Sequence, residues 1–493
     1  MTEESQLLAA VTAAPNDETA RLVYADWLKE QGSSQGAFIQ GQCRLATLGE
    51  AHPEWSTLHA QTERLRRAGE ARWVEPLATL LPSREVWATT SRKFRRGFVE
   101  HLASPNPAMD WRILSSLVRT TPLRSVAWRP PGESPDDLAS ALAAAADARL
   151  TGAFVLSSGS LRQDAFSAVD AEIASQFQAF GIRSATVHPA TVAHLTQLLR
   201  PDLVSLVLDH TIIGDAGLLP LAASGLLATV QHLDLRGNQL DREGITALVA
   251  KSSDVPIALN LADNEEAIPH VERVLDWRPL RRLDLVGTVD RLAIDAVIRS
   301  PAILDLEHLA LAPKQPWHFD VDRAHSLAAV PFRRLTRLTL GRCRIEASGM
   351  AALAESPSLA NLVGFEAFAC DLGDRGVQAL VESAHVKRLV QLDLNNNGLT
   401  DVALEALGSW PGLRNVVRLR LGHNYGITEQ GWRILLNATP FDPTELGVVH
   451  GLKTGNPGLW AALEERFGSD VLYEDGARWP TPYPSPYPTL DPL

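Results

Sequence analysis

The chain has 493 residues, and its 58 acidic and 46 basic residues give a net charge of −12 at pH 7. This excess of negative charge repels phosphate backbones, which excludes sequence-independent binding to nucleic acid unless a local basic face exists. The 3 cysteines are too few for a disulfide framework and show no zinc-ligand spacing, so a reducing compartment is expected. The apolar fraction of 45% is ordinary for a globular protein.

Residues 1–18 are acidic and lack the basic flank and apolar core of a secretory signal. No run approaches the roughly 18 apolar residues that a membrane span requires. We therefore expect a cytoplasmic protein without a membrane partner.

Residues 1–50 are expected to form a small domain of three short helices. In the middle helix, apolar residues recur at helical spacing after the N-cap candidates Asn16 and Asp17, and Gly32 supplies a stop. The apolar positions are Ala20, Val23, Tyr24, Trp27 and Leu28. Asp26 lies among them and is either a catalytic carboxylate or, as we favour, a partner of a neighbouring helix.

The stretch Arg21–Leu28, with the sequence RLVYADWL, is followed by Gly32 and by Ala37-Phe38-Ile39-Gln40. This pattern resembles the repeat-companion domain of bacterial leucine-rich-repeat proteins, known chiefly from myxobacteria and planctomycetes. The charged residues usual in the second segment of that family are missing here. The resemblance covers about a tenth of the chain and implies repeats downstream; it implies no activity.

A helical connector is expected over residues 51–90, followed over residues 91–200 by an N-terminal cap with degenerate repeats. Residues 91–100 hold four basic residues within five positions, Arg92, Lys93, Arg95 and Arg96. They are either a patch for phosphate or an acidic partner, or, as we favour, the outer side of a first strand whose inner side is Phe94, Phe98 and Leu102. Two later segments have strand spacing, 123–128 and 154–156, and we expect residues 130–132 and an Ala-rich helix at 138–148 to interrupt the repeats.

From residue 203 the chain repeats a pattern of the form LxxLxLxxN. Its last position falls at Thr211, Asn238, Asn264, Thr288, Lys314, Cys343, Cys370, Asn397 and Asn424, with spacings of 27, 26, 24, 26, 29, 27, 27 and 27 residues. This is the leucine-rich-repeat period, and the nine units span residues 201–440. In each unit a short strand turns its leucines into a shared core, and the Asn satisfies backbone groups of the neighbouring coil. We interpret Cys343 and Cys370 as buried substitutes for that Asn.

Helices are expected after the strands, with starts marked by Gly217, Gly244, Gly349 and Gly376. These units resemble the ribonuclease-inhibitor-like class of leucine-rich repeat. That resemblance implies an α/β solenoid of horseshoe shape, with a parallel sheet on its concave face and helices on its convex face, joined to a small α-helical N-terminal domain. The irregular spacings before Thr288 and Cys343 predict a protruding loop at Pro313, Pro316 and Trp317.

Beyond residue 440 the repeat pattern stops. Residues 441–478 are expected to cap the last repeat with a helix near 459–468 and a strand near 471–473. Residues 479–493 form a tail in which Pro480, Pro482, Pro484, Pro486 and Pro488 exclude helix and sheet. The tail is either a disordered end, as we favour, or a polyproline ligand.

No sequence motif of an enzyme is present: there is no phosphate-binding loop, nucleophile elbow, HExxH or CxxC. His318 and His325 flank Asp320 and Asp322, but their spacing matches no metal site. We therefore expect no catalytic residue, cofactor or metal. Cys43 is the one cysteine outside the repeats and the one candidate nucleophile.

The outward strand positions of the repeats are the candidate partner-binding residues. Asp209 is the earliest such position, and the selected set is His232, Asp234, Arg236, Arg282, Asp284, His308, Arg337, Glu366, Phe368, Asp393, Asn395, Arg418 and Arg420. We hypothesise a non-enzymatic scaffold that binds a protein on this face. The alternatives are the substrate reader of a ubiquitin-ligase-like or toxin enzyme, and a spacer whose N-terminal helical domain docks an assembly.

Overall fold

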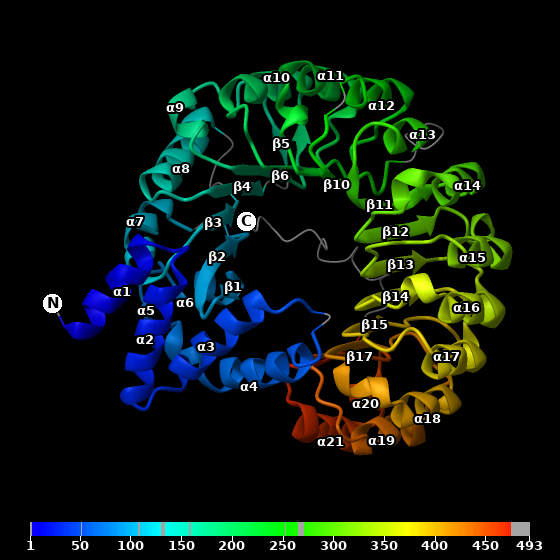
Figure 1. Ribbon diagram of the computed structural model, residues 1–493. Coiled ribbons are helices and arrows are strands. Elements are labelled where there is room, and N and C mark those ends of the chain that lie inside the picture. The colour runs from blue at the N-terminus through cyan, green and yellow to red at the C-terminus, as the bar shows by residue number, and fades with distance from the viewer. Residues whose placement is uncertain are drawn as a thin grey trace. The chain divides into compact units, whose positions relative to one another are not determined.

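The computed structural model describes residues 2–50, 52–106, 109–129, 134–156, 159–251, 253–264 and 271–474 (Figure 1). Within these ranges the chain divides into two compact units. The first unit holds residues up to 48 and from 61 to 257, and the second holds residues 49–60 and those from 258 onward. The proline-rich tail predicted at 479–493 lies outside the described residues.

The helices of the first unit are α1 (Glu3–Ala13), α2 (Glu18–Glu30), α3 (Ser34–Thr47), α5 (Glu75–Ala78), α6 (Arg84–Thr89), η1 (Trp111–Ile113), α7 (Leu114–Thr120), α8 (Pro135–Asp147), α9 (Ala171–Ala174), α10 (Pro189–Leu198), α11 (Gly214–Ser224), η2 (Leu226–Ala228) and α12 (Arg242–Leu248). Helix α4 (Trp55–Trp73) has residues in both units. The strands of the first unit are β1 (Ser91–Arg95), β2 (Phe98–Ser104), β3 (Ser125–Trp128), β4 (Gly152–Leu156), β5 (Ser160–Leu161), β6 (Ala179–Arg183), β7 (Thr186–Val187), β8 (Ser205–Asp209) and β9 (His232–Asp234).

The three helices predicted over residues 5–48 are α1, α2 and α3. Helix α2 begins after Asp17, whose Oδ1 accepts a hydrogen bond from the Thr19 N–H at 2.9 Å. It ends before Gly32, which has a φ of +72°. Asp26 accepts a hydrogen bond from Gln40 Nε2 of α3 at 2.6 Å, so it joins two helices as favoured from the sequence.

The basic segment at residues 91–100 is a hairpin, whereas the sequence interpretation had placed it in a single strand. Strands β1 and β2 pair antiparallel, and the two residues between them, Arg96 and Gly97, have φ values of 47° and 88°. Two successive positive φ values are typical of the tight hairpin turn that matches strand twist. A Cβ on Gly97 would lie 2.4 Å from Ile39 Cγ1, so α3 packs directly on this turn.

The repeat period extends back through the parallel strands of the first unit, beginning at β2. Strands β2, β3, β4, β6, β8 and β9 pair in parallel through Leu102, Val126, Ala153, Phe180, Leu206 and Leu233, at spacings of 24, 27, 27, 26 and 27 residues. The strands expected at 123–128 and 154–156 are β3 and β4. The prediction that the Ala-rich helix interrupts the repeats was wrong. This helix, α8, lies between β3 and β4 and is itself the helix of a repeat. Residues 130–132 lie outside the described residues.

Strand β10 (Ile257–Asn260) stands at the boundary between the units. The strands of the second unit are β11 (Leu280–Val289), β12 (His308–Pro313), β13 (Arg337–Gly341), β14 (Gly364–Phe368), β15 (Gln391–Asp393), β16 (Arg418–Arg420), β17 (Glu445–Val448) and β18 (Leu472–Glu474). Its helices are α13 (Val271–Leu275), α14 (Arg291–Arg299), η4 (Pro301–Ile303), η5 (Pro316–His318), α15 (Val321–Ala328), α16 (Glu346–Glu355), η6 (Pro357–Leu359), α17 (Gly373–Glu382), α18 (Asp401–Ser409), η7 (Pro411–Asn415), α19 (Glu429–Asn437), α20 (Leu452–Gly455) and α21 (Pro457–Phe467).

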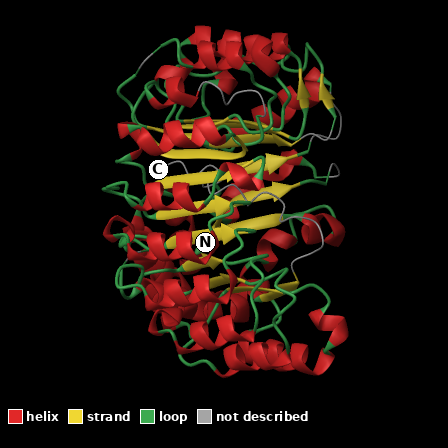
Figure 2. Ribbon diagram, turned by 90° about the vertical axis from the view of Figure 1, so that its right-hand side faces the viewer, coloured by secondary structure: helices red, strands yellow, loops and turns green. Residues whose placement is uncertain are grey.

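The strands form a long, mainly parallel sheet, in which β11 to β18 follow one another in chain order. Figure 2 shows the strands running side by side. In the second unit, helices α14 to α19 all lie on one side of β11–β17 (Figure 1). The opposite side of these strands is called the strand face below.

The sheet continues past residue 440, where the sequence pattern had been expected to stop. Leu419, Leu446 and Leu472 are successive register partners at spacings of 27 and 26 residues. Helix α21 and strand β18 fall where a terminal helix and strand were predicted. At Pro316–His318 the expected loop is a short 3-10 turn, and Trp317 is 59% exposed.

The asparagines of the repeats form a ladder of buried hydrogen bonds. Asn397 Nδ2 donates to the Ala367 carbonyl at 2.6 Å, and its Oδ1 accepts from the Cys370 N–H at 3.0 Å. Asn424 makes the equivalent bonds one repeat later, to the Leu394 carbonyl and the Asn397 N–H. The Cys343 and Cys370 thiols are buried and donate to backbone carbonyls, as predicted for substitutes of this asparagine.

Neighbouring repeats are also joined on the helix side by aspartates. Asp401, the first residue of α18, accepts from the Thr428 N–H at 2.7 Å and from the Gly431 N–H at 3.1 Å at the start of α19. A Cβ at Gly431 would lie 2.3 Å from Asp401 Oδ1, so a larger residue here would force this carboxylate to move. Gly244 makes the same approach to Asp215 Oδ1, whereas at Gly217, Gly349 and Gly376 an added Cβ would instead meet an apolar side chain.

We predict that Gly431→Ala lowers the free energy of unfolding by about 1–2 kcal/mol, although Gly→Ala inside a helix normally stabilises by about 1 kcal/mol. The added methyl group displaces Asp401 and breaks its bonds to α19. Urea denaturation measures the effect. The matched control is Gly455→Ala in α20, where a Cβ meets nothing within 4 Å; equal effects of the two substitutions would refute the prediction.

Candidate binding surface

The structure divides the candidate residues between the two units. His232, Asp234 and Arg236 belong to the first unit, at β9 and directly after it. The other ten belong to the second unit, where the strand register arranges them in transverse rows. They are Arg282, Asp284, His308, Arg337, Glu366, Phe368, Asp393, Asn395, Arg418 and Arg420.

The first row of the strand face runs across the starts of the strands. In register order it consists of Arg282, His308, Arg337, Gly364, Gln391, Arg418 and Glu445. Arg337 is engaged within the protein: its Nη1 donates to Gln391 Oε1 at 2.6 Å, and its Nη2 pairs with Glu50. The Arg418 side chain, by contrast, is 43% exposed, and the nearest Glu445 oxygen is 3.9 Å from its Nε.

The second row contains a network of ion pairs. In register order it consists of Asp284, Ala310, Thr339, Glu366, Asp393, Arg420, Gly447 and Tyr473. Arg420 Nη2 donates to Glu445 at 2.6 Å, its Nη1 lies 3.8 Å from Asp393, and the Tyr473 hydroxyl donates to Glu445 at 3.0 Å. The neighbouring carboxylates and tyrosine raise the pKa of Arg420 against the effect of burial.

Glu366 occupies the middle of this second row. Its burial raises the pKa of the carboxyl group to about 7, and the negative charge of Asp393 acts in the same direction. Thr339 Oγ1 donates to Glu366 Oε2 at 2.6 Å. Near neutral pH the carboxyl group of Glu366 is therefore close to half protonated.

The third row lies where the strands end, at Gly341, Phe368 and Asn395. The Phe368 ring covers Gly341, where a Cβ would lie 2.1 Å from the ring. Asn395 is 1% exposed, and among the residues that the structure describes neither its Nδ2 nor its Oδ1 has a hydrogen-bond partner. A buried amide without partners is uncommon in folded proteins, so Asn395 requires an explanation.

His308 is buried between two arginines of the first row. Burial lowers its pKa to about 3, and the charges of Arg282 and Arg337 act in the same direction. His308 is therefore a neutral imidazole near neutral pH.

In the first unit the outward positions are bound to nearby backbone or side chains. Asp234 is 2% exposed and accepts from the Arg236 N–H at 3.1 Å. The Asp209 carboxylate contacts His210 Nδ1 at 2.6 Å and lies 3.9 Å from Arg183.

Several residues of the strand face were missed by sequence reasoning. Thr339 and Gln391 occupy the same alternating positions as the chosen residues and could have been selected by that signal. Glu445 and Tyr473 lie on β17 and β18, where the leucine motif is lost. The pairing of Glu50 with Arg337 joins residues 287 apart in sequence, and no local pattern indicates it.

Cys43, the one candidate nucleophile, is 1% exposed. Burial raises the pKa of its thiol to about 11, so the thiolate form is scarce at neutral pH. No cluster of metal ligands occurs among the residues that the structure describes. In the segment that holds His318 and His325, Asp320 caps α15 and pairs with Arg323 at 3.0 Å.

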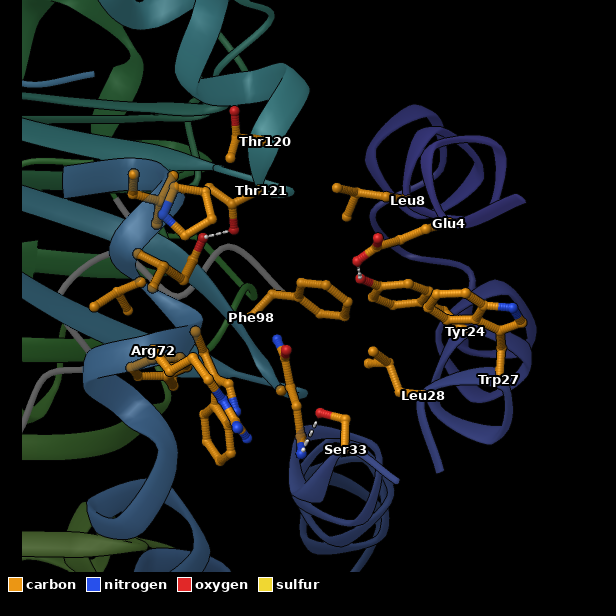
Figure 3. A pocket seen from close by; sticks show the side chains of 18 of the residues that line it. Glu4, Leu8, Tyr24, Trp27, Leu28, Ser33, Arg72, Phe98, Thr120 and Thr121 are labelled. Carbon is orange, nitrogen blue, oxygen red and sulfur yellow. Dashed lines mark hydrogen bonds between the residues drawn. The ribbon is translucent and has the colours of Figure 1, made fainter. Parts of the chain in front are cut away.

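A cleft lies in the first unit, between helices α1–α3 and the hairpin (Figure 3). This cleft has a volume of about 450 Å³. Tyr24, Trp27 and Leu28 line one side and Phe98 points toward them, with Tyr24 stacked on Phe98 at 5.9 Å and on Trp27 at 6.1 Å. Three residues of the RLVYADWL motif thus line this cleft.

The first residue of that motif anchors the helices to the hairpin. Arg21 is fully buried, and its Nη2 donates to Glu100 Oε1 of β2 at 2.7 Å and to the Pro15 carbonyl at 2.7 Å. Its guanidinium also lies over the Phe98 ring. The basic residues Arg96 and Arg124 approach the same carboxylate at 3.8 and 3.9 Å. One member of the predicted basic patch, Arg96, is therefore part of this buried cluster.

A family model agrees with the repeats at two places in the chain. Residues 227–249 and 389–408 match the leucine-rich-repeat family model, so the chain contains leucine-rich repeats. A chain of the crystallised Rad7–Elc1 complex from yeast is 16% identical, with a TM-score of 0.43 and 92% of each chain covered. An internalin from Listeria monocytogenes is 15% identical, with a TM-score of 0.34, and the match covers 77% of this chain and 87% of the internalin. No curated protein matches the sequence.

Proposed function

We propose that the protein is a non-enzymatic recognition scaffold that binds a partner protein on the strand face of its second unit. The observation that carries this proposal is the set of transverse rows, in which successive repeats present side chains on a side of the sheet opposite helices α14–α19. Solenoid repeats characteristically bind partners on such an extended surface.

The candidate arginines of the strand face differ in how strongly they are paired within the protein. Arg337 and Arg420 hold the face together through Glu50, Gln391, Glu445 and Asp393, so their charge is largely compensated within the protein. Arg418, whose side chain is 43% exposed, is our leading contact for a carboxylate of the partner.

The alternative functions are less well supported. A ligase-like or toxin enzyme would need a reactive nucleophile, and the buried Cys43 with its raised pKa is unsuited to that role. A docking module joined to a spacer would be expected to hold its helices apart from the repeats. The buried contact of Arg21 with Glu100 instead ties these helices to β2.

Localisation in the cytoplasm stays part of the proposal. Among the described residues, no helix combines the length and apolar character that crossing a membrane would demand. The bacterial origin, the companion-domain family and the ribonuclease-inhibitor-like class are likewise proposed from the sequence resemblance alone.

The proposal is tested by affinity purification with Arg418→Glu, followed by quantitative mass spectrometry. We expect the amount of the specific partner that is recovered to fall at least tenfold, because the substitution places a negative charge opposite the carboxylate of the partner. The matched control is Arg299→Glu on α14, which changes the same charge on the exposed helix side. Undiminished partner recovery with Arg418→Glu, or equal losses with both variants, would refute the proposed face.

A further inference from the structure

We propose that the cleft of the first unit is a second docking site, which binds a peptide segment of a partner protein through an apolar anchor flanked by one basic and one acidic side chain. The cleft belongs to a different unit from the strand face, so this site is independent of the proposed function. Three features carry the proposal: the aromatic lining of the cleft, the opposite charges at its two sides, and the apolar surface that continues from it along α2.

The lining of the cleft suits a large apolar side chain. Aromatic rings from α2, from the end of α4 and from the hairpin form the walls together with aliphatic side chains, the main contributors being Leu8, Tyr24, Trp27, Leu28, Trp73 and Phe98. The volume of about 450 Å³ lies within the roughly 300–1,000 Å³ that ligand pockets usually have. Pockets of this kind hold the buried anchors that supply most of the binding energy of an interface.

Glu4 of α1 forms the acidic side of the cleft. The Tyr24 hydroxyl donates to Glu4 Oε1 at 3.4 Å (Figure 3). Burial raises the pKa of Tyr24, and the negative charge of Glu4 acts in the same direction, so this hydroxyl keeps its proton and remains a donor. Glu4 is exposed, and in the described part of the chain no basic side chain pairs with it. Its carboxylate is therefore available to a basic side chain of a ligand.

Arg72, near the end of α4, forms the basic side of the cleft. Its side chain is exposed and forms no ion pair with any residue that the structure describes. In Figure 3, Glu4 and Arg72 lie on opposite sides of Phe98. A ligand that carries a basic group on one side of its anchor and an acidic group on the other therefore complements both sides of the cleft.

The apolar surface continues beyond the edge of the cleft along α2. Val23 precedes Trp27 by four residues, which places the two side chains next to each other on the helix surface. The Val23 side chain is 50% exposed. A small molecule confined to the cleft leaves Val23 in water, whereas a peptide extends over it and buries it. Peptides that lay a row of apolar side chains into a groove bind in this way, so we infer a peptide as the ligand.

The test selects a phage-displayed library of short random peptides against the full chain. We expect the enriched peptides to share a large apolar residue with a basic residue on one side and an acidic residue on the other. One such peptide, synthesised with a dansyl label, is then titrated with the protein by fluorescence anisotropy. Glu4→Arg and Arg72→Glu should each weaken its binding about tenfold, because each substitution brings like charges together. Both residues are exposed, so we expect both variants to fold.

The matched control is Glu3→Arg, which makes the same change in the first turn of α1 at a residue outside the lining of the cleft. Because both positions lie in the first turn, any effect on the helix dipole is the same. The control should leave the affinity unchanged. A peptide whose basic and acidic residues are exchanged should bind the double variant, Glu4→Arg with Arg72→Glu, as tightly as the original peptide binds the parent.

Failure to enrich any peptide would overturn the proposal, as would an affinity that the variants at Glu4 and Arg72 leave unchanged. An equal loss with Glu3→Arg would overturn it too. Binding that is lost in Arg418→Glu and kept in both cleft variants would place the peptide on the strand face, which also contradicts the proposal. Loss of the partner in Arg418→Glu tests the strand face separately, so the two proposals can fail independently.

Discussion

Arg21→Met is expected to lower the free energy of unfolding by about 3 kcal/mol, one of the two largest effects that the structure predicts. Arg21 is fully buried and forms the shortest of the three ion pairs to the Glu100 carboxylate. Methionine keeps much of the side-chain volume but removes the guanidinium that lies closest to Glu100, so a buried charge loses its nearest compensation. Urea denaturation, with hydrogen exchange to locate the change, measures the loss.

The matched control for this prediction is Arg112→Met. Arg112 also pairs with an acidic residue, Asp110, at 2.8 Å, but its side chain is 89% exposed. Exposed ion pairs contribute less than about 1 kcal/mol. We expect faster exchange in α2 and the β1–β2 hairpin with Arg21→Met alone. A loss no greater than that of the control would show that Arg21 does not anchor the helices.

Acidification to pH 5 is expected to remove about 2 kcal/mol of stability for each of the two buried histidines, His101 and His308. Burial lowers the pKa of both to about 3, from an ordinary value of 6.5. The unfolded chain therefore binds protons between pH 6.5 and 3 that the folded chain does not. Their stabilising contribution is fully present above pH 6.5 and is lost as the pH falls below that value.

His308→Gln isolates one of these contributions, because glutamine cannot take up the proton. The difference in free energy of unfolding between the parent and His308→Gln should shift by about 2 kcal/mol from pH 7.5 to pH 5. The same substitution at an exposed position, His325→Gln, is the matched control. Parallel pH profiles for the parent and His308→Gln would contradict the prediction.

Glu366 contributes a pH dependence of the opposite sign. Its pKa is raised to about 7 in the folded state, so the folded chain holds a proton that the unfolded chain releases between pH 4.5 and 7. This contribution to stability is present at low pH and is lost as the pH rises through 7. The comparison between variants, and not the parent profile alone, therefore measures the effect of His308.

The leucine periodicity predicted the repeats well where the leucines are present. Leu392 on β15 and Leu394 directly after it, for example, are buried core residues, and Asn397 makes the predicted ladder bonds. The same period continues at Val126, Ala153 and Phe180, but these residues lack the consensus identity. At Leu446 the period survives while the flanking leucines do not, so β17 was missed.

The alternation of strand residues predicted which way the side chains point. It did not predict how far they are buried or which residues they pair with. Asp393 and Asn395 face outward as predicted, yet they are 2% and 1% exposed. Arg337 was selected as a binding residue, and its ion pair with Glu50 depends on a contact between distant parts of the chain. The pairing of Arg21 with Glu100 likewise joins positions 79 residues apart. Such contacts depend on the folded chain and leave no local signal.

The central claim, that the strand face of the second unit binds a partner protein, is tested most directly by a hydrogen-exchange footprint of the complex. Once a partner is purified, backbone amides of β13–β17 should exchange more slowly in the complex than in the isolated protein. Amides of helices α14–α19 should be unchanged. Protection confined to those helices, with unaltered exchange in the strands, would contradict the claim.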